Sequence, residues 1–258
     1  MPILLSFVLA GIAAALVGIA FGLPSLRIKG FYLAVATLAA QFFVPWLLVK
    51  VGWFSNYSAS GVITAQTIEI FGFRFDQPAT KYLLVLAIVA LLALAAKNMV
   101  RSAIGRSWMA VRDMDVAAAV IGIPIMRTKL TAFAVSSFYC GVAGALYAYA
   151  YVGTVQPEDL NLDLSFRILF MIIIGGVGSI LGSFLGAAFI TLLPILLEIV
   201  LHFLSTTLHL GVPPGATSMV QLLVFGALII FFLVVEPHGL ARLWQIAKEK
   251  LRLWPFPH

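Results

Sequence analysis

The chain has 258 residues, of which 62% are hydrophobic and only 10% are charged. Soluble domains are roughly 45–50% apolar, so the composition excludes an ordinary soluble globule and predicts a polytopic membrane protein. The formal net charge is +6. Because the basic residues lie between apolar runs, this charge favours cytoplasmic retention of loops over nucleic-acid binding.

The N-terminal part predicts three membrane spans and one external loop. The first apolar run, residues 3–23, can cross a core of about 30 Å, and no positive charge precedes it as in a signal peptide. A second run covers residues 31–51. Residues 52–81 are polar, and their alternating stretch at 67–76 is typical of a β-hairpin. A third span is expected at 82–96.

A polar segment at 97–129 interrupts the apolar pattern. Its basic residues are Lys97, Arg101, Arg106, Arg112, Arg127 and Lys129, against Asp113 and Asp115. The stretch from Asp115 to Gly122 predicts a helix of small residues with a stop signal. A fourth span at 130–152 carries two small-residue ridges that suit tight helix packing: Ser137, Gly141, Ala145 and Cys140, Gly144, Ala148.

The C-terminal part contains a glycine break between apolar segments. Residues 165–174 are followed by the break at Gly175, Gly176 and Gly178, a long apolar run at 179–204, and a last span at 218–235. The tail at 236–258 mixes basic residues with tryptophans and is typical of an interfacial amphipathic end. We expect this tail to be cytoplasmic.

Orientation follows from lysine and arginine in the short loops. Loops 24–30 and 97–129 and the tail are basic and are expected in the cytoplasm, so loops 52–80 and 153–164 face outward. The path from the outward loop 153–164 to the cytoplasmic tail must cross the membrane an odd number of times. One crossing by residues 165–204 and one by the last span would give two, so the sequence predicts a broken or re-entrant helix at 165–178. The fold expected for 1–258 is a single all-α transmembrane domain with about six to seven membrane segments.

Few residues suggest chemistry of their own. The break continues as Gly182 and Gly186, which indicates close helix packing, a hinge beside a solute path, or both. Arg167 is expected to reach the outer interface, and Glu198 with His202 favours interfacial placement over a metal or proton site. The sequence lacks a Gly-Lys-Ser/Thr phosphate loop. Energy for uphill transport would then come from an ion gradient or from another subunit, and the scarcity of buried carboxylates favours another subunit. We expect no enzyme activity, cofactor or metal.

Several motifs together resemble the membrane subunits of bacterial ABC importers for branched-chain amino acids. They are the stretch from Gly105 to Gly122, the Gly141-Val-Ala-Gly144 motif, the Gly175-Gly176-Val-Gly178-Ser179 break, and Pro237-His-Gly239-Leu240 in the tail. The resemblance implies a permease of the bacterial inner membrane. It also implies a second related permease, two cytoplasmic ATP-binding cassette ATPase subunits and a periplasmic solute-binding protein as partners, besides the lipid bilayer.

The chain departs from this family in three places. Family members usually begin with further spans that carry a Gly-Ser-Leu-Gly motif, and this chain starts after that point. The glycine-rich loop expected after the second span is replaced by residues 55–61, and Arg167 stands where an acid is expected. These departures affect the solute path and the substrate rather than the resemblance itself.

The resemblance gives the polar segment a function. We expect 97–129 to be a cytoplasmic coupling loop on which the ATPase docks around residues 105–123; an ordinary amphipathic surface helix is the alternative. The coupling residues are predicted to be Arg106, Arg112, Asp113, Asp115, Ala117, Ala118 and Gly122. The pathway or hinge is assigned to Gly175, Gly176, Gly178, Gly182 and Gly186, and helix packing to Gly141 and Gly144.

The expected substrates are branched-chain or other hydrophobic amino acids. Urea or short amides are the second possibility, and sugars the third. Two other classes of protein stay open, a secondary transporter or channel that works alone and a membrane scaffold that transports nothing. The coupling segment favours the importer, because a lone channel has no use for it.

Overall fold

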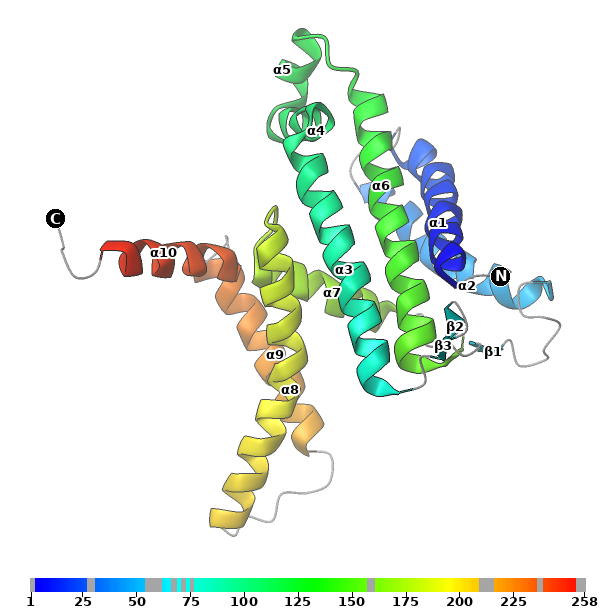
Figure 1. The fold of residues 1–258 in the computed structure, drawn as a ribbon. Helices are drawn as coiled ribbons and strands as arrows, with labels where there is room; N and C mark the ends of the chain where they lie inside the picture. Colours follow the sequence, from blue (N-terminus) through cyan, green and yellow to red (C-terminus); the bar gives the residue numbers. More distant parts are fainter. Residues whose placement is uncertain are drawn as a thin grey trace. The chain divides into compact units, whose positions relative to one another are not determined.

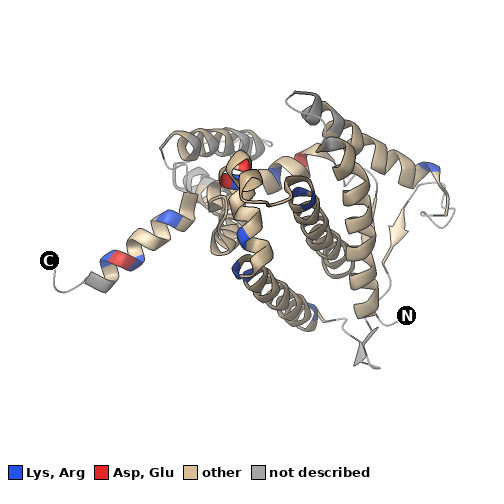
Figure 2. Ribbon diagram, turned by 90° about the horizontal axis from the view of Figure 1, so that it is seen from above, with Lys and Arg blue, Asp and Glu red and all other residues tan. Residues whose placement is uncertain are grey.

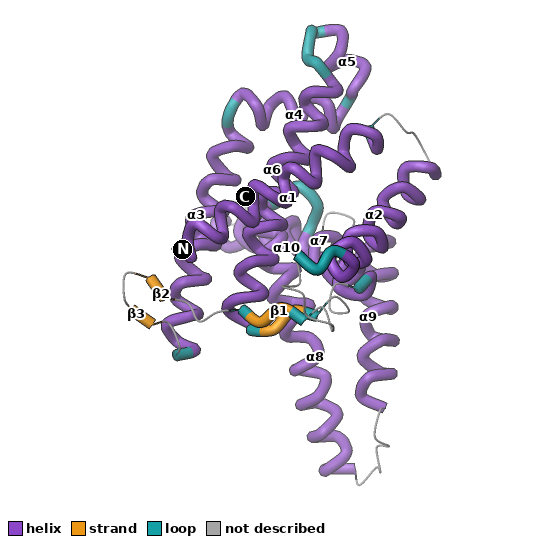
Figure 3. Tube along the Cα trace, turned by 90° about the vertical axis from the view of Figure 1, so that its right-hand side faces the viewer, coloured by secondary structure: helices purple, strands orange, loops and turns teal. Residues whose placement is uncertain are grey.

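The computed structural model describes residues 3–26, 31–53, 62–65, 69–70, 73–74, 77–156, 161–208, 216–235 and 239–253. Helices make up most of the described chain (Figure 3). The chain divides into two units, Met1–Leu160 and Asn161–His258.

The first unit contains the N-terminal helices and all the described strands (Figure 1). Its helices are α1 (Ile3–Ser25), α2 (Phe31–Lys50), α3 (Pro78–Arg101), α4 (Ala103–Asp113), α5 (Asp115–Val120) and α6 (Ile125–Leu146), and α6 continues as the π-helix η1 (Tyr147–Val152). Its strands are β1 (Ile63–Thr64), β2 (Glu69–Ile70), β3 (Phe73–Arg74) and β4 (Thr154–Val155). The second unit consists of α7 (Leu162–Gly175), α8 (Ile180–Leu208), α9 (Ala216–Val235) and α10 (Gly239–Leu253).

Four helices among the described residues are long and apolar enough to cross a membrane. They cover Ile3–Pro24, Pro78–Arg101, Ile125–Val152 and Ile180–Val200, and Thr37–Lys50 is a shorter apolar helix. The most apolar window of α3 has no buried residue, although its mean hydropathy is 2.4. A soluble protein rarely exposes so large an apolar surface, so these helices fit the expected all-α membrane protein. The expected six to seven segments stay a prediction.

The polar segment at 97–129 is largely helical rather than a loop. The third span extends to Arg101, α4 and α5 follow it, and α6 already begins at Ile125. The boundary predicted at residue 130 therefore falls within α6. Polarity does not distinguish a loop from an amphipathic surface helix.

Helices α1 and α6 pack side by side in opposite directions. Gly11 of α1 lies against Phe138 and Val142, whereas Gly18, farther along α1, lies against Ser137. At one end of this contact the buried side chains are Ile3, Phe7, Val142 and Leu146. Leu84, Val85, Ile88 and Leu92 of α3 pack against the same core. The hydroxyl of Tyr139 also donates to the carbonyl of Leu92 at 3.0 Å, which joins α6 to α3.

Two short strand pairs lie in the segments expected to face outward. Strand β1 pairs antiparallel with β4, with Thr64 opposite Thr154. Strands β2 and β3 also pair antiparallel. Residues 71–72 between β2 and β3, including the expected turn glycine Gly72, lie outside the described residues, as does the stretch 55–61. The hairpin therefore stays a prediction.

Candidate functional site

One serine connects α3 to α4 in the polar segment. The Ser102 hydroxyl donates to the carbonyl of Met99 at 2.7 Å and accepts the backbone N–H of Gly105 at 3.4 Å. Ser102 thereby caps the N-terminus of α4. A Cβ at Gly105 would overlap the carbonyl oxygens of Met99 and Val100. The change of direction at this point therefore needs a glycine.

Helix α5 ends in a hydrogen-bonded glycine turn. Gly122 has φ of 85°, and the N–H of Ile123 donates to the carbonyl of Ala118 at 3.0 Å. This bond, together with a left-handed glycine after the last turn, is the pattern of a Schellman stop. A Cβ at Gly122 would meet nothing within 4 Å, so the space beside it is open. The φ value nevertheless disfavours any other residue there.

The outward face of α5 is apolar. Val116 and Val120 are one turn apart and are 75% and 83% exposed, and Met114 and Ile121 are exposed beside them. We call Val116 and Val120 the α5 apolar face; Met114 and Ile121 flank the helix at its two ends. Ala118, in contrast, is only 2% exposed, so its side chain faces the rest of the protein. The predicted coupling residues did not include the two valines, whose i, i+4 spacing was the available signal.

Charged residues lie on α4, at the start of α5 and at the start of α6. The Nε of Arg112 lies 2.9 Å from Asp113 Oδ1, and the Nζ of Lys129 lies 3.8 Å from Asp115 Oδ2. Arg106 donates through Nη1 to the carbonyl of Arg101 at 3.2 Å. Exposed ion pairs contribute only about 0–1 kcal/mol. These residues therefore form a polar rim and do little to hold α4 and α5 in place.

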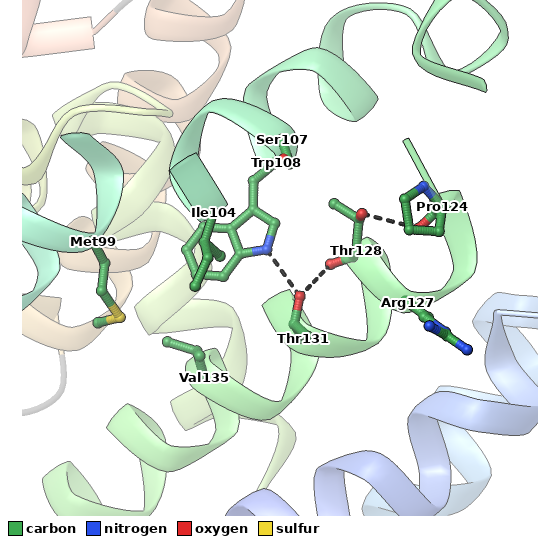
Figure 4. A pocket seen from close by; sticks show the side chains of 9 residues that line it. All are labelled: Met99, Ile104, Ser107, Trp108, Pro124, Arg127, Thr128, Thr131 and Val135. Carbon is green, nitrogen blue, oxygen red and sulfur yellow. Dashed lines mark hydrogen bonds between the residues drawn. The ribbon is translucent and has the colours of Figure 1, made fainter. Parts of the chain in front are cut away.

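A hydrogen-bonded tryptophan joins α4 to α6 (Figure 4). The indole Nε1 of Trp108 donates to Thr131 Oγ1 at 3.1 Å, and the Thr131 hydroxyl donates to the carbonyl of Thr128 at 2.9 Å. The buried Thr128 donates its own hydroxyl proton to the carbonyl of Pro124, also at 2.9 Å. None of these three side chains was among the predicted site residues.

A cavity of about 370 Å³ lies beside Trp108 (Figure 4). Its lining comes from the end of α3, from α4 and from the start of α6: Met99, Ile104, Ser107, Trp108, Pro124, Arg127, Thr128, Thr131 and Val135. The Trp108 bond therefore joins α4 to α6 at the edge of this cavity.

The predicted hinge glycines of the second unit bring two helix backbones together. A Cβ at Gly175 would overlap the carbonyl of Gly182, and a Cβ at Gly186 would overlap the carbonyl of Met171. Gly176 and Gly178, with φ of 106° and 88°, form the turn between α7 and α8. Ser179 Oγ then accepts the N–H of Gly182 at 3.1 Å and caps α8.

The start of α10 packs on this turn. A Cβ at Gly239 would lie 2.5 Å from the nitrogen of Gly176 and 2.6 Å from the carbonyl oxygen of Ile174. The neighbouring core consists of Ile174, Ile190 and Phe232, with Leu240 packed against it. The tail glycine and the hinge glycine are therefore direct neighbours.

The remaining predicted residues differ in their surroundings. Gly141 lies against Ala10, Gly11 and Ala14 of α1, whereas a Cβ at Gly144 would meet nothing within 4 Å. The side chains of Ala117, Arg167 and Glu198 are exposed. The described residues contain no group of three or more His, Cys, Asp or Glu side chains that could hold a metal ion.

The sequence was compared with known proteins. A model of the family described as "Branched-chain amino acid transport system / permease component" matches residues 1–233. The high-affinity branched-chain amino acid transport system permease protein LivM of Escherichia coli is 28% identical over 255 residues, covering 90% of this chain and 56% of that protein. A probable branched-chain amino acid transport permease protein LivM of Methanocaldococcus jannaschii is 26% identical over 242 residues, covering 92% and 68%.

A shorter match is to a permease with a different name. The autoinducer 2 import system permease protein LsrC of Klebsiella pneumoniae is 33% identical over 110 residues, covering 40% of this chain and 31% of that protein. The chain spans about half the length of the Escherichia coli relative. No solved structure matches this chain.

Proposed function

Because the chain belongs to the branched-chain amino acid transport system / permease component family, we propose that it is the transmembrane permease subunit of an ATP-driven importer. Members of this family are transport components, and ATP hydrolysis is assigned to separate subunits. Four apolar helices of membrane-spanning length support a multi-pass protein of the bacterial inner membrane.

The proposed solutes are branched-chain or other hydrophobic amino acids. Two relatives that align with 90% or more of this chain carry branched-chain amino acid transport in their names. The relative named for autoinducer 2 aligns with only 40% of it. Urea or short amides, sugars, and a stand-alone transporter or channel are the alternatives that the experiment below has to exclude.

The first unit supports the proposed orientation. Its paired strands β1 and β4 lie at one end of α3 and α6, and α4 and α5 lie at the other end (Figure 1). The segments that contain β1 and β4 are therefore proposed to lie on one side of the membrane and the basic segment on the opposite side. Since basic segments stay in the cytoplasm, α4 and α5 are proposed to face the cytoplasm.

The second unit supports a re-entrant segment. Helix α7 has 14 residues, which is about 21 Å at 1.5 Å per residue and too short for a core of about 30 Å. Its C-terminal turn contacts Gly239 at the start of α10. If the tail is cytoplasmic, the α7–α8 turn lies on that side as well. In this arrangement α7 descends partway through the membrane, and α8 returns toward the side from which α7 entered.

Helix α5 is the proposed docking element for the ATPase. Val116 and Val120 are exposed on a segment that is proposed to face water, and such apolar faces mark protein interaction sites. The polar rim of Arg106, Arg112, Asp113 and Asp115 would fix the orientation of the partner. The full assembly is proposed to contain two ATPase subunits, a second related permease and a periplasmic binding protein. The glycine-lined contact of α7 with α8 is proposed as its hinge.

A charge placed on the α5 apolar face tests this function. Val120→Asp is expected to abolish ATP-dependent leucine uptake in proteoliposomes that contain the partner subunits, without loss of membrane insertion. The matched control is Ala103→Asp, which adds the same charge in the first turn of α4, where an acid is favourable. Normal uptake by Val120→Asp would exclude docking through α5. ATP-independent uptake by this chain alone would favour the stand-alone transporter.

A further inference from the structure

Helix α10 has an uncovered apolar face. Leu240, Leu243, Trp244, Ala247 and Leu251 follow the i, i+3, i+4, i+7 spacing of one helix side. Leu240 packs into the core of its own unit, but Leu243, Trp244 and Leu251 are 44%, 55% and 75% exposed. After its first turn the helix therefore exposes apolar side chains that its own unit does not cover.

Basic residues border this face. At 100° per residue, Lys250 lies beside one edge of the apolar stripe and Lys248 beside the other. Both side chains are exposed, and Glu249 is the one acid between Gly239 and Leu253. Figure 2 shows basic residues (blue) on α10 toward its C-terminal end. Lysines at the edges of an apolar stripe are placed to reach phosphates while their stems cover apolar surface.

The connection to α9 determines where this face can lie. Only residues 236–238 separate Val235 from Gly239, and three residues span at most about 11 Å. Helix α9 is an apolar helix of 20 residues, the length that a bilayer core requires. Helix α10 runs out to the side of α8 and α9 (Figure 1). Its position at the end of a span is that of a helix lying on a membrane surface.

The first turn of α10 cannot shift independently of the α7–α8 turn. Gly239 has φ of 65° and leaves no room for a Cβ beside Gly176. Ala241 is buried, and its Cβ lies 3.1 Å from the position of a Cβ on Gly182. A force on α10 is therefore passed to the glycines of the turn.

From these observations we propose that α10 binds anionic phospholipid at the membrane surface and thereby holds the α7–α8 turn at that depth. The apolar face enters the acyl boundary, and Lys248 and Lys250 bind headgroup phosphates. The inference rests on the membrane placement in the proposed function, but not on ATPase docking or on the substrate. A helix that binds a protein partner could lie anywhere on the chain, whereas α10 directly follows a membrane span. Its position therefore favours lipid as the occupant.

Lipid-borne quenchers test the proposal in the full chain. Cys140 is the single cysteine, so a Cys140→Ser background accepts one fluorophore at Leu243→Cys on the apolar face or at Gln245→Cys on the polar face. Nanodiscs contain brominated phosphatidylcholine with or without phosphatidylglycerol. We expect quenching at position 243 but not at 245, an increase with phosphatidylglycerol, and a decrease at high salt. Lys248→Gln with Lys250→Gln is expected to remove the dependence on phosphatidylglycerol, whereas Lys50→Gln with Lys81→Gln is expected to keep it.

A label at Leu91→Cys of α3 separates two kinds of failure. Quenching at 91 without quenching at 243 would overturn lipid binding by α10, and quenching at neither position would overturn the membrane placement. Quenching at 243 that does not change with phosphatidylglycerol would overturn the anionic specificity. Protection of position 243 only after an ATPase subunit is added would assign α10 to a protein partner instead.

The link to the turn has its own measurement. Val177 is 74% exposed in the α7–α8 turn, so a fluorophore at Val177→Cys reports its depth. Gly239→Ala is expected to shift the quenching at 177. The control Gly226→Ala, where a Cβ would meet nothing within 4 Å, is expected to leave it unchanged. No shift with Gly239→Ala would show that α10 does not hold the turn.

Discussion

The indole nitrogen of Trp108 donates a hydrogen bond to Thr131 Oγ1 at 3.1 Å, and this bond joins α4 to α6 beside a cavity. The Thr131 hydroxyl donates its own proton to the carbonyl of Thr128, and its oxygen accepts the hydrogen bond from the indole N–H. Because the bond joins α4 to α6 directly, it is well placed to pass a displacement of α5 through α4 to α6. Loss of this bond therefore tests the connection directly.

Trp108→Phe is expected to lower ATP-dependent uptake severalfold while the protein still inserts. The substitution keeps an aromatic ring but removes the donor, and a hydrogen bond of this kind contributes about 0.5–1.5 kcal/mol. Uptake and ATPase stimulation are measured in proteoliposomes that contain the partner subunits. Thr131→Val removes the acceptor, so the double variant should lose no more than either single variant. Fully additive losses would contradict a role for the bond itself.

Parts of this arrangement could be predicted from the sequence, because local chemistry determines them. Gly176 and Gly178 in the break and Gly122 at the stop have positive φ, which glycine supplies without strain. The pairing of Trp108 with Thr131 was not predictable, because the two residues are 23 positions apart and no pattern along the chain reports which polar groups meet. Polarity also failed to reveal α4, whose start depends on the hydroxyl of Ser102.

Gly186→Ala is expected to destabilise the second unit. A Cβ at this position would overlap the carbonyl of Met171 and lie 2.9 Å from the Cα of Gly175, and such overpacking costs about 1–3 kcal/mol. Thermal unfolding of the detergent-solubilised protein should therefore begin at lower temperature, and uptake should fall. Gly226→Ala in α9 is the matched control, because it adds the same methyl group where nothing lies within 4 Å. Equal stability of the two variants would mean that α7 and α8 do not need this close approach.

The contact between Gly18 and Ser137 offers a rescue experiment in the first unit. A Cβ at Gly18 would overlap the Oγ of Ser137, and the next nearest atom outside Ser137, the carbonyl oxygen of Phe133, is 3.7 Å away. Gly18→Ala should therefore lower the unfolding temperature, and adding Ser137→Gly should restore much of it because the obstructing side chain is removed. Ser137→Gly with Gly144→Ala serves as the control, since a Cβ at Gly144 meets nothing within 4 Å. Failure of the first pair to recover would contradict the direct packing of α1 on α6.

The pairing of Thr64 with Thr154 allows a test of the proposed orientation. The N–H of Ala65 donates to the carbonyl of Gly153, so the adjacent pair, Thr64 with Thr154, is a non-hydrogen-bonded pair with Cα atoms about 4.5 Å apart. That separation lies within the range of a disulfide. In a Cys140→Ser background, Thr64→Cys with Thr154→Cys should cross-link on oxidation, and a membrane-impermeant thiol reagent should reach either single variant from the periplasmic side. Thr64→Cys with Val155→Cys is the control, because adjacent residues point to opposite faces of a strand. Labelling of these positions only from the cytoplasmic side would reverse the orientation and would exclude α5 as a cytoplasmic docking helix.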